Sequence, residues 1–197
     1  LPIFLELKDK KVLLVGGGTI AEEKLVKLVA VGARVHIVAS AIRPSVHALV
    51  KKHALQAAER SFEEADVAGH FLVISAVNNA ALHSHIAGVA RAKGILTNAV
   101  DAPESSDFYF GAQVERGPLQ LAISTQGLFP GVARSIRLWL EELLPIEITP
   151  EFEDLAALRR AIRGRIPDPV RRMKALKDQL LVWNTQTSNQ FLENRYE

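Results

Sequence analysis

The chain has 197 residues, of which 48% are hydrophobic and 23% charged, with no cysteine and a net charge of +2. This composition is typical of a globular protein with a buried core, and it excludes collagen-like, disulfide-stabilised and disordered chains as well as thiolate metal sites and thiol nucleophiles. No apolar run reaches the roughly 18 residues of a membrane span, so we expect a cytoplasmic protein whose partners include neither a membrane nor nucleic acid.

The first hundred residues alternate short apolar runs with helical periodicity, as a parallel α/β sheet requires. The runs predict strands over residues 12–15, 34–38, 55–58, 71–74 and 95–100. The apolar spacing between them predicts helices over residues 20–31, 45–53 and 79–93. We therefore predict a Rossmann-like, doubly wound parallel sheet that forms a domain over residues 1–106.

The pattern changes after residue 106. Residues 107–114 and 119–124 are strand-like and flank the turn signal Gly117-Pro118, which favours an antiparallel hairpin. From Pro130 onward the sequence predicts helices over 131–144, 151–163 and 169 to about 191. We expect a hairpin–helix module over 107–145 and a basic helical C-terminal domain over 146–197.

The strongest local motif lies directly after the first predicted strand, where residues 16–21 read Gly-Gly-Gly-Thr-Ile-Ala. In this G-x-G-x-x-A pattern the first glycine permits a tight turn, the second leaves room for a pyrophosphate, and the alanine lets helix and strand pack closely. The free N–H groups of the following helix can bind the phosphates. Unless the turn is purely structural, the cofactor contacts are Gly16, Gly18, Thr19, Ile20 and Ala21.

The second predicted strand ends without the acid that often binds the ribose of NAD. Ser40 can hydrogen-bond a ribose there, and Arg43 is either a ligand for a 2′-phosphate or an exposed residue at a helix start. The chemistry of these residues leaves NAD and NADP open.

Ligands of doubly wound sheets bind at the carboxyl ends of the strands. Ala76 and Asn78 follow the fourth predicted strand, and we expect both to contact the cofactor. Asp101 follows the fifth and is the only acid that directly ends a predicted core strand at this edge, so it is well placed as a general base. The alternative is an ordinary turn residue.

The histidines do not predict a metal site. His83 and His85 are two residues apart on a predicted helix and so lie on different faces, whereas a helical ligand pair needs a spacing of four. We interpret both as ordinary helix residues and predict no metal ligand in the chain.

Two segments of the second half can bind an anion. Ser124, Thr125 and Gly127 lie between a predicted strand and a predicted helix, where hydroxyls and a helix N-terminus can receive a carboxylate. Residues 159–177 carry a net charge of +7, beginning with Arg159 and Arg160, which indicates an anionic partner. A plain loop and a solvated helix face are the alternatives.

The order of these motifs resembles the precorrin-2 dehydrogenase family, the dehydrogenase and ferrochelatase module of siroheme synthase. The resemblance covers residues 1 to about 144. The matching segments are Pro2-Ile3-Phe4-Leu5, Val15-Gly16-Gly17-Gly18, Asn98-x-Val100-Asp101, Asp107-Phe108 and Gly117-Pro118-Leu119 with Ala122-Ile123-Ser124-Thr125-x-Gly127. The chain departs from the family pattern at Asn78-Asn79, Leu82-His83, Gly111 and Phe129.

The resemblance implies NAD-dependent oxidation of precorrin-2 to sirohydrochlorin, followed in some members by insertion of ferrous iron. It also implies a homodimer formed through residues 107–145. Asp101 falls on the family's catalytic aspartate, and the implied substrate-binding residues are Asn98, Ser124, Thr125, Gly127, Arg159 and Arg160.

Two other functions fit part of the sequence. A regulatory module that binds NAD to control a partner needs no acid in the cleft, so Asp101→Ala would leave its function intact. A dehydrogenase for another small acid needs no basic C-terminal segment.

Overall fold

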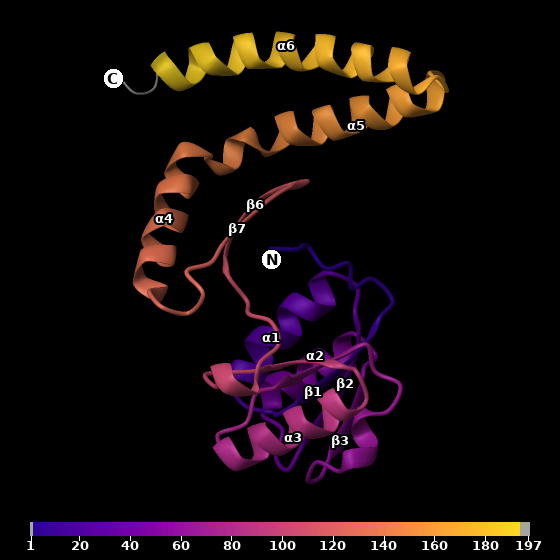
Figure 1. Ribbon diagram of the computed structural model, residues 1–197, viewed down its shortest axis with the longest axis vertical. Helices are drawn as coiled ribbons and strands as arrows, with labels where there is room; N and C mark the ends of the chain where they lie inside the picture. Colours follow the sequence, from indigo (N-terminus) through magenta and orange to yellow (C-terminus); the bar gives the residue numbers. More distant parts are fainter. Residues whose placement is uncertain (1, 194–197) are drawn as a thin grey trace. The chain divides into compact units, whose positions relative to one another are not determined.

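The computed structural model describes residues 2–193 and consists of two compact units, Leu1–Tyr109 and Phe110–Glu197 (Figure 1). The first unit ends three residues beyond the predicted boundary at 106. The second unit contains the hairpin together with all the helices that follow it. The predicted division of this half at residue 145 therefore stays a proposal.

The first unit is built on a five-stranded parallel sheet in the order β3-β2-β1-β4-β5. The chain fills one half of the sheet, then crosses over and fills the other, so the order reverses between β1 and β4. This is the predicted doubly wound, Rossmann-like arrangement, and it is confirmed. The strands are β1 (Lys11–Val15), β2 (Arg34–Ala39), β3 (Gln56–Glu59), β4 (Leu72–Ser75) and β5 (Leu96–Ala99).

Helices connect these strands: α1 (Thr19–Ala30), α2 (Pro44–Lys52) and α3 (Ala80–Ala92), with short 3₁₀ turns η1 (Glu64–Val67) and η2 (Pro103–Ser105). Each helix lies within two residues of its predicted range because glycines and capping residues end the apolar periods. The Asn79 side chain, for example, accepts a hydrogen bond from the Leu82 N–H and so starts α3.

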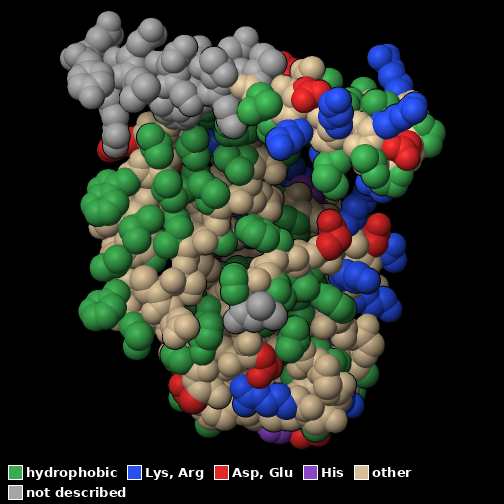
Figure 2. Space-filling model, turned by 45° about the horizontal axis from the view of Figure 1, so that its top comes forward, with side chains coloured by type: hydrophobic (Ala, Val, Ile, Leu, Met, Phe, Trp, Pro, Cys, Tyr) green, Lys and Arg blue, Asp and Glu red, His purple; other side chains and the backbone are tan. Residues whose placement is uncertain are grey.

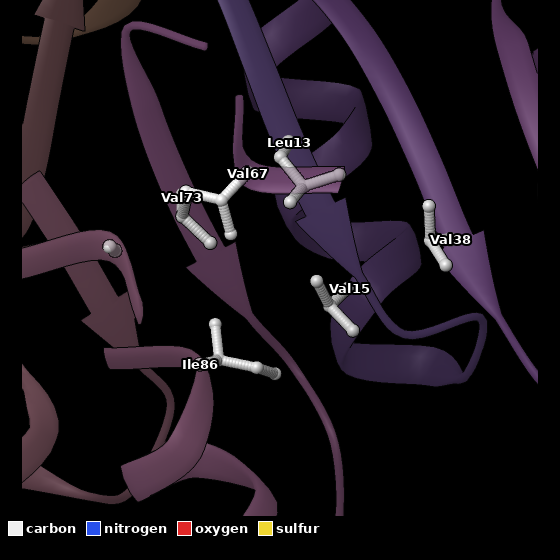
Figure 3. Packing of buried hydrophobic residues seen from close by; sticks show 7 residues of the cluster. Leu13, Val15, Val38, Val67, Val73 and Ile86 are labelled. Atoms are coloured by element: carbon white, nitrogen blue, oxygen red, sulfur yellow. The ribbon is translucent and has the colours of Figure 1, made fainter. Parts of the chain in front are cut away.

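One face of the sheet packs against α3 and η1. Figure 3 shows Leu13, Val15 and Val73 from the strands meeting Ile86 of α3 and Val67 of η1, each of them buried. Neighbouring strand residues point to opposite faces, so Val12 and Leu14 lie on the other side, where α1 contacts α2. Because both faces are covered, β1 and β4 contain continuous apolar runs, residues 12–15 and 72–74, rather than alternating residues.

Residues 60–67 contain an element that the apolar pattern did not predict. Both terminal nitrogens of Arg60 donate to the buried Asp66 carboxylate, at 2.8 and 2.6 Å, and the Glu63 N–H donates to it at 2.9 Å. These hydrogen bonds, that of Arg60 foremost, hold the pKa of Asp66 below its ordinary value of 3.8. The charge pair thus stabilises η1. Because side-chain hydrogen bonds hold this turn, apolar periodicity in the sequence does not predict it.

The second unit begins with the antiparallel hairpin of β6 (Ala112–Arg116) and β7 (Leu119–Ile123). It continues with α4 (Pro130–Leu143), η3 (Ile146–Ile148), α5 (Thr149–Arg165) and α6 (Pro169–Glu193). Helix α4 contacts both hairpin strands, and α5 contacts α6. None of the helices in the described part of the chain is both long enough and apolar enough to span a membrane.

The predicted strand over 107–114 is wrong in its first half, since β6 begins at Ala112. Residues 107 and 108 are held by the end of the parallel sheet instead. The Asp107 carboxylate accepts from the Thr97 N–H and from Arg91 Nε, both at 2.9 Å. Asn98 Nδ2 donates to the Phe108 carbonyl at 2.8 Å. These side-chain contacts take the place of strand pairing.

Candidate functional site

The glycine-rich turn between β1 and α1 has the close approaches that its sequence predicts. Gly16 has a φ of +131°, and a Cβ there would lie 2.3 Å from the carbonyl oxygen of Ala76. A Cβ on Gly17 would lie 2.3 Å from the carbonyl oxygen of Ala41. These two glycines are therefore required by the fold itself, because the turn passes between the ends of β2 and β4.

Gly18 is different because nothing in the fold requires it. Its φ of −89° suits any residue, and a Cβ would meet no atom of the described chain within 4 Å. It is the N-cap of α1, a position where Ser, Asp or Asn would bind the free N–H groups of the helix. Open space over an uncapped helix N-terminus fits a bound pyrophosphate, whose oxygens would accept from those N–H groups. Thr19, Ile20 and Ala21 form the first turn behind it.

The ends of β2 and β3 lie beside this turn. Ser40 is exposed directly after β2, and Arg43 Nη1 donates a hydrogen bond to Thr19 Oγ1, so the guanidinium lies over the start of α1. Asp101 is not the only acid at this edge of the sheet, because the edge strand β3 supplies another. Strand β3 runs one residue further than predicted and ends on Glu59, whose carboxylate accepts from the Ile42 N–H at 3.2 Å.

A cleft of about 240 Å³ opens on the other side of the turn, where β4 and β5 end and α3 begins. It brings together four of the predicted site residues, Ile20, Ala76, Asn78 and Asp101. The remaining lining residues are Val77, Asn79, Ala80, His83, Val100, Ala102 and Glu104. The wall is thus apolar at Ile20 of α1 and mixed on the side of α3 and the loop after β5, where His83, Asp101 and Glu104 lie among apolar residues.

Asp101 lies in the turn that follows β5 and is exposed within this cleft. Its φ of +59° is a left-handed conformation that few non-glycine residues adopt, although aspartate is among those that tolerate it. The carboxylate also acts on Lys24 of α1. Burial lowers the pKa of Lys24, as does Lys27, while the charges of Glu23 and Asp101 oppose that shift. Asp101 therefore lies within electrostatic range of the helix that begins at the glycine-rich turn.

His83 and Ser75 form a polar pair at this cleft that the sequence did not predict. His83 is only 5% exposed yet lines the cleft, and its Nδ1 lies 2.8 Å from the Oγ of Ser75, which is fully buried at the end of β4. From its spacing relative to His85, His83 is expected to be an ordinary helix residue and no metal ligand. His83 follows Asn79, the N-cap residue of α3, by four residues. This spacing puts the two residues on the same face of the helix, and it was the signal available in the sequence.

Of the other predicted residues, Asn98 serves the fold and the rest belong to the second unit. Asn98 is 6% exposed and its amide is bound to the Phe108 carbonyl. In the second unit, Ser124 Oγ accepts from the Gln126 N–H and Thr125 Oγ1 from the Phe129 N–H. Both hydroxyls therefore shape the loop before α4. This loop also holds Gly127, where a Cβ would meet no described atom within 4 Å, while Arg159 and Arg160 are exposed on α5.

Within the described residues, no group of three or more His, Cys, Asp or Glu side chains is arranged to hold a metal ion. The cleft offers the Asp101 and Glu104 carboxylates and the hydrogen-bonding side chains of Asn78, Asn79 and His83.

Comparisons with known proteins agree with this geometry. The siroheme synthases of Methylococcus capsulatus and Zymomonas mobilis are 36% and 34% identical to the chain over 86% and 93% of its length. The chain spans a little over a third of these proteins, 36% and 37%. A solved structure described as SirC, precorrin-2 dehydrogenase, has a TM-score of 0.75 and 25% identity, and the similarity covers 98% of this chain and 99% of that one. The model of a family described as putative NAD(P)-binding matches residues 3–112. Because this match includes more than half of the chain and the whole glycine-rich turn, the chain belongs to that NAD(P)-binding family.

Proposed function

We propose that this chain is an NAD-dependent precorrin-2 dehydrogenase, which oxidises precorrin-2 to sirohydrochlorin in siroheme biosynthesis. The observation that carries the proposal is the cleft in which Asp101 lies beside the glycine-rich turn of an NAD(P)-binding fold. The likeness to a precorrin-2 dehydrogenase along almost the whole chain supports it, as do the siroheme synthases among its relatives.

The reaction removes a hydride and a proton from the macrocycle. Bound NAD⁺ supplies the hydride acceptor. The N-terminus of α1 and the space over Gly18 hold its pyrophosphate. Ile20 and Ala76 cover the apolar side of the cleft and limit the access of water. The Asp101 carboxylate accepts the proton, because it lies in the turn after β5 at the cleft and is open to a ligand.

The substrate is a polycarboxylate, so positive charge on the protein favours its binding. Arg159 and Arg160 are exposed on α5, and Figure 2 shows Lys and Arg side chains gathered near the loop between α5 and α6. Exposed charges of this kind attract an anion over a distance and are screened by salt. Ser124, Thr125 and Gly127 add a loop at the start of α4 that can accommodate a carboxylate.

We further propose that the chain works as a homodimer through α4 and the loop before it. Of the apolar side chains on this helix only Ala133 is fully buried. Phe129 and Trp139 are each 66% exposed, and Leu128, Val132, Leu138 and Leu143 are exposed as well. An apolar surface of this kind is typical of a protein–protein interface.

Ferrous iron is a second substrate in this proposal. The macrocycle supplies the nitrogen ligands, so the protein needs only to hold the macrocycle and accept the pyrrole protons. Asp101 is placed to accept these protons too.

The test is to incubate the purified chain with precorrin-2 and NAD⁺ and follow the absorbance of sirohydrochlorin, then add ferrous iron and follow siroheme. Asp101→Asn should bind NADH normally and lose about 10²- to 10⁴-fold in turnover. Glu104→Gln is the matched control, because it removes a second carboxylate from the same cleft. NADH binding without turnover in the unmodified chain would favour the regulatory module instead.

A further inference from the structure

The sheet order determines which half of the cofactor each part of the site can bind. The glycine-rich turn lies at the end of β1, and β1 is flanked by β2 on one side and by β4 on the other. In this fold the adenosine half lies at the end of β2, where the acid that binds its ribose is usually found. With the pyrophosphate over Gly18, the other half must extend toward β4. The nicotinamide therefore enters the cleft between β4, α3 and β5.

His83 is the most enclosed polar side chain in the lining of that cleft. Ser75 belongs to the sheet and is completely buried, so its hydroxyl is a fixed partner for His83 Nδ1. Backbone contacts hold both ends of the pair: the Ser75 carbonyl accepts from the Val100 N–H at 2.9 Å, and the His83 N–H donates to the Asn79 carbonyl at 3.0 Å. The position of Nδ1 is therefore constrained by the protein before any ligand binds.

We propose that His83, held by Ser75, binds the carboxamide of the nicotinamide through Nε2. A neutral imidazole has one donor and one acceptor, and Ser75 can take either role at Nδ1 because a hydroxyl both donates and accepts. Nε2 then presents the complementary role. The carboxamide offers both a carbonyl oxygen and an NH₂ group, so it can match either one. One hydrogen bond of this kind fixes the rotation of the ring and hence the face that receives the hydride.

The proposal rests on the proposed function only in taking NAD as the cofactor, and the experiment separates the two. NADH and ADP-ribose share the adenosine, the pyrophosphate and both riboses, and ADP-ribose lacks only the nicotinamide. Dissociation constants for both are measured by calorimetry with the full chain and with three variants: His83→Leu, Ser75→Ala and His85→Leu. His85 is the matched control because it lies on the same helix, is exposed, and faces Glu64 rather than the cleft.

We expect His83→Leu to weaken NADH binding about 3- to 10-fold, the effect of one hydrogen bond, and to leave ADP-ribose binding unchanged. Ser75→Ala should weaken NADH binding less, because the imidazole remains but loses its fixed partner. His85→Leu should change neither ligand. Unchanged NADH binding in His83→Leu would overturn the proposal. An equal loss of both ligands would overturn it as well, because His83 would then act through the packing of α3. Failure of the unmodified chain to bind ADP-ribose would refute the NAD site itself, and the proposal with it.

Discussion

Gly18 allows the cofactor site to be tested separately from the fold. Gly18→Asp and Gly18→Asn place side chains of nearly equal volume at the N-cap of α1, in space that no described atom of the protein occupies within 4 Å. Both side chains are favoured N-caps, and the φ of −89° accepts them without strain. Only the aspartate adds a negative charge at the position where the pyrophosphate would lie.

The expected magnitudes follow from this geometry. Replacing glycine by a better N-cap residue changes the free energy of unfolding by only a few tenths of a kcal/mol, so both variants should melt within about 2 °C of the original chain or slightly above it. A carboxylate about 5 Å from a phosphate charge costs about 1–3 kcal/mol at effective dielectric constants between those of water and a protein surface. Gly18→Asp should therefore bind NADH about 5- to 150-fold more weakly than Gly18→Asn.

The assay is a fluorescence titration with NADH beside a thermal melt of each variant. Gly16→Ala is the contrasting variant, because its Cβ would lie 2.3 Å from the Ala76 carbonyl oxygen and its φ of +131° disfavours any side chain. It should lower the melting temperature and NADH binding together. Equal NADH affinities for Gly18→Asp and Gly18→Asn would refute the placement of the pyrophosphate, and a large drop in their melting temperatures would show that Gly18 serves the fold.

Three further predictions concern other parts of the chain. The double variant Arg159→Gln/Arg160→Gln should raise the KM for precorrin-2 and leave the KM for NAD⁺ unchanged; a wild-type KM for precorrin-2 that does not rise with salt would contradict this. Trp139→Ser should shift the chain from dimer toward monomer in sedimentation experiments, and an unchanged dimer would place the interface elsewhere. Asp66→Asn should lower the melting temperature at pH 7. Because Arg60 lowers the pKa of Asp66, the stabilisation is complete above the ordinary value of 3.8 and is lost as the pH falls below it, so the two melting curves should converge in acid.

The sequence by itself determined the parallel sheet and the glycine-rich turn. Both faces of β1 and β4 are covered, so their residues form continuous apolar runs that can be read without knowing their neighbours. The turn over residues 16–21 can also be recognised from the sequence, because its glycines are adjacent and lie between a strand and a helix, although the atoms that Gly16 and Gly17 approach belong to Ala76 and Ala41. The position of Asp101 at the cleft could be predicted as well, since it lies two residues after a strand whose carboxyl end must lie at the ligand-binding edge.

Only the tertiary structure decided which polar side chains face the cleft. The helical period places His83 on a face of α3, but the position of β4 between β1 and β5 brings that face onto Ser75. Asn98 is a predicted site residue whose side chain serves the fold instead. It lies near the end of β5 as expected, but its amide donates to the Phe108 carbonyl ten residues away. Contacts of this kind depend on the order of strands and the direction of side chains, and hydrophobic periodicity carries no information about either.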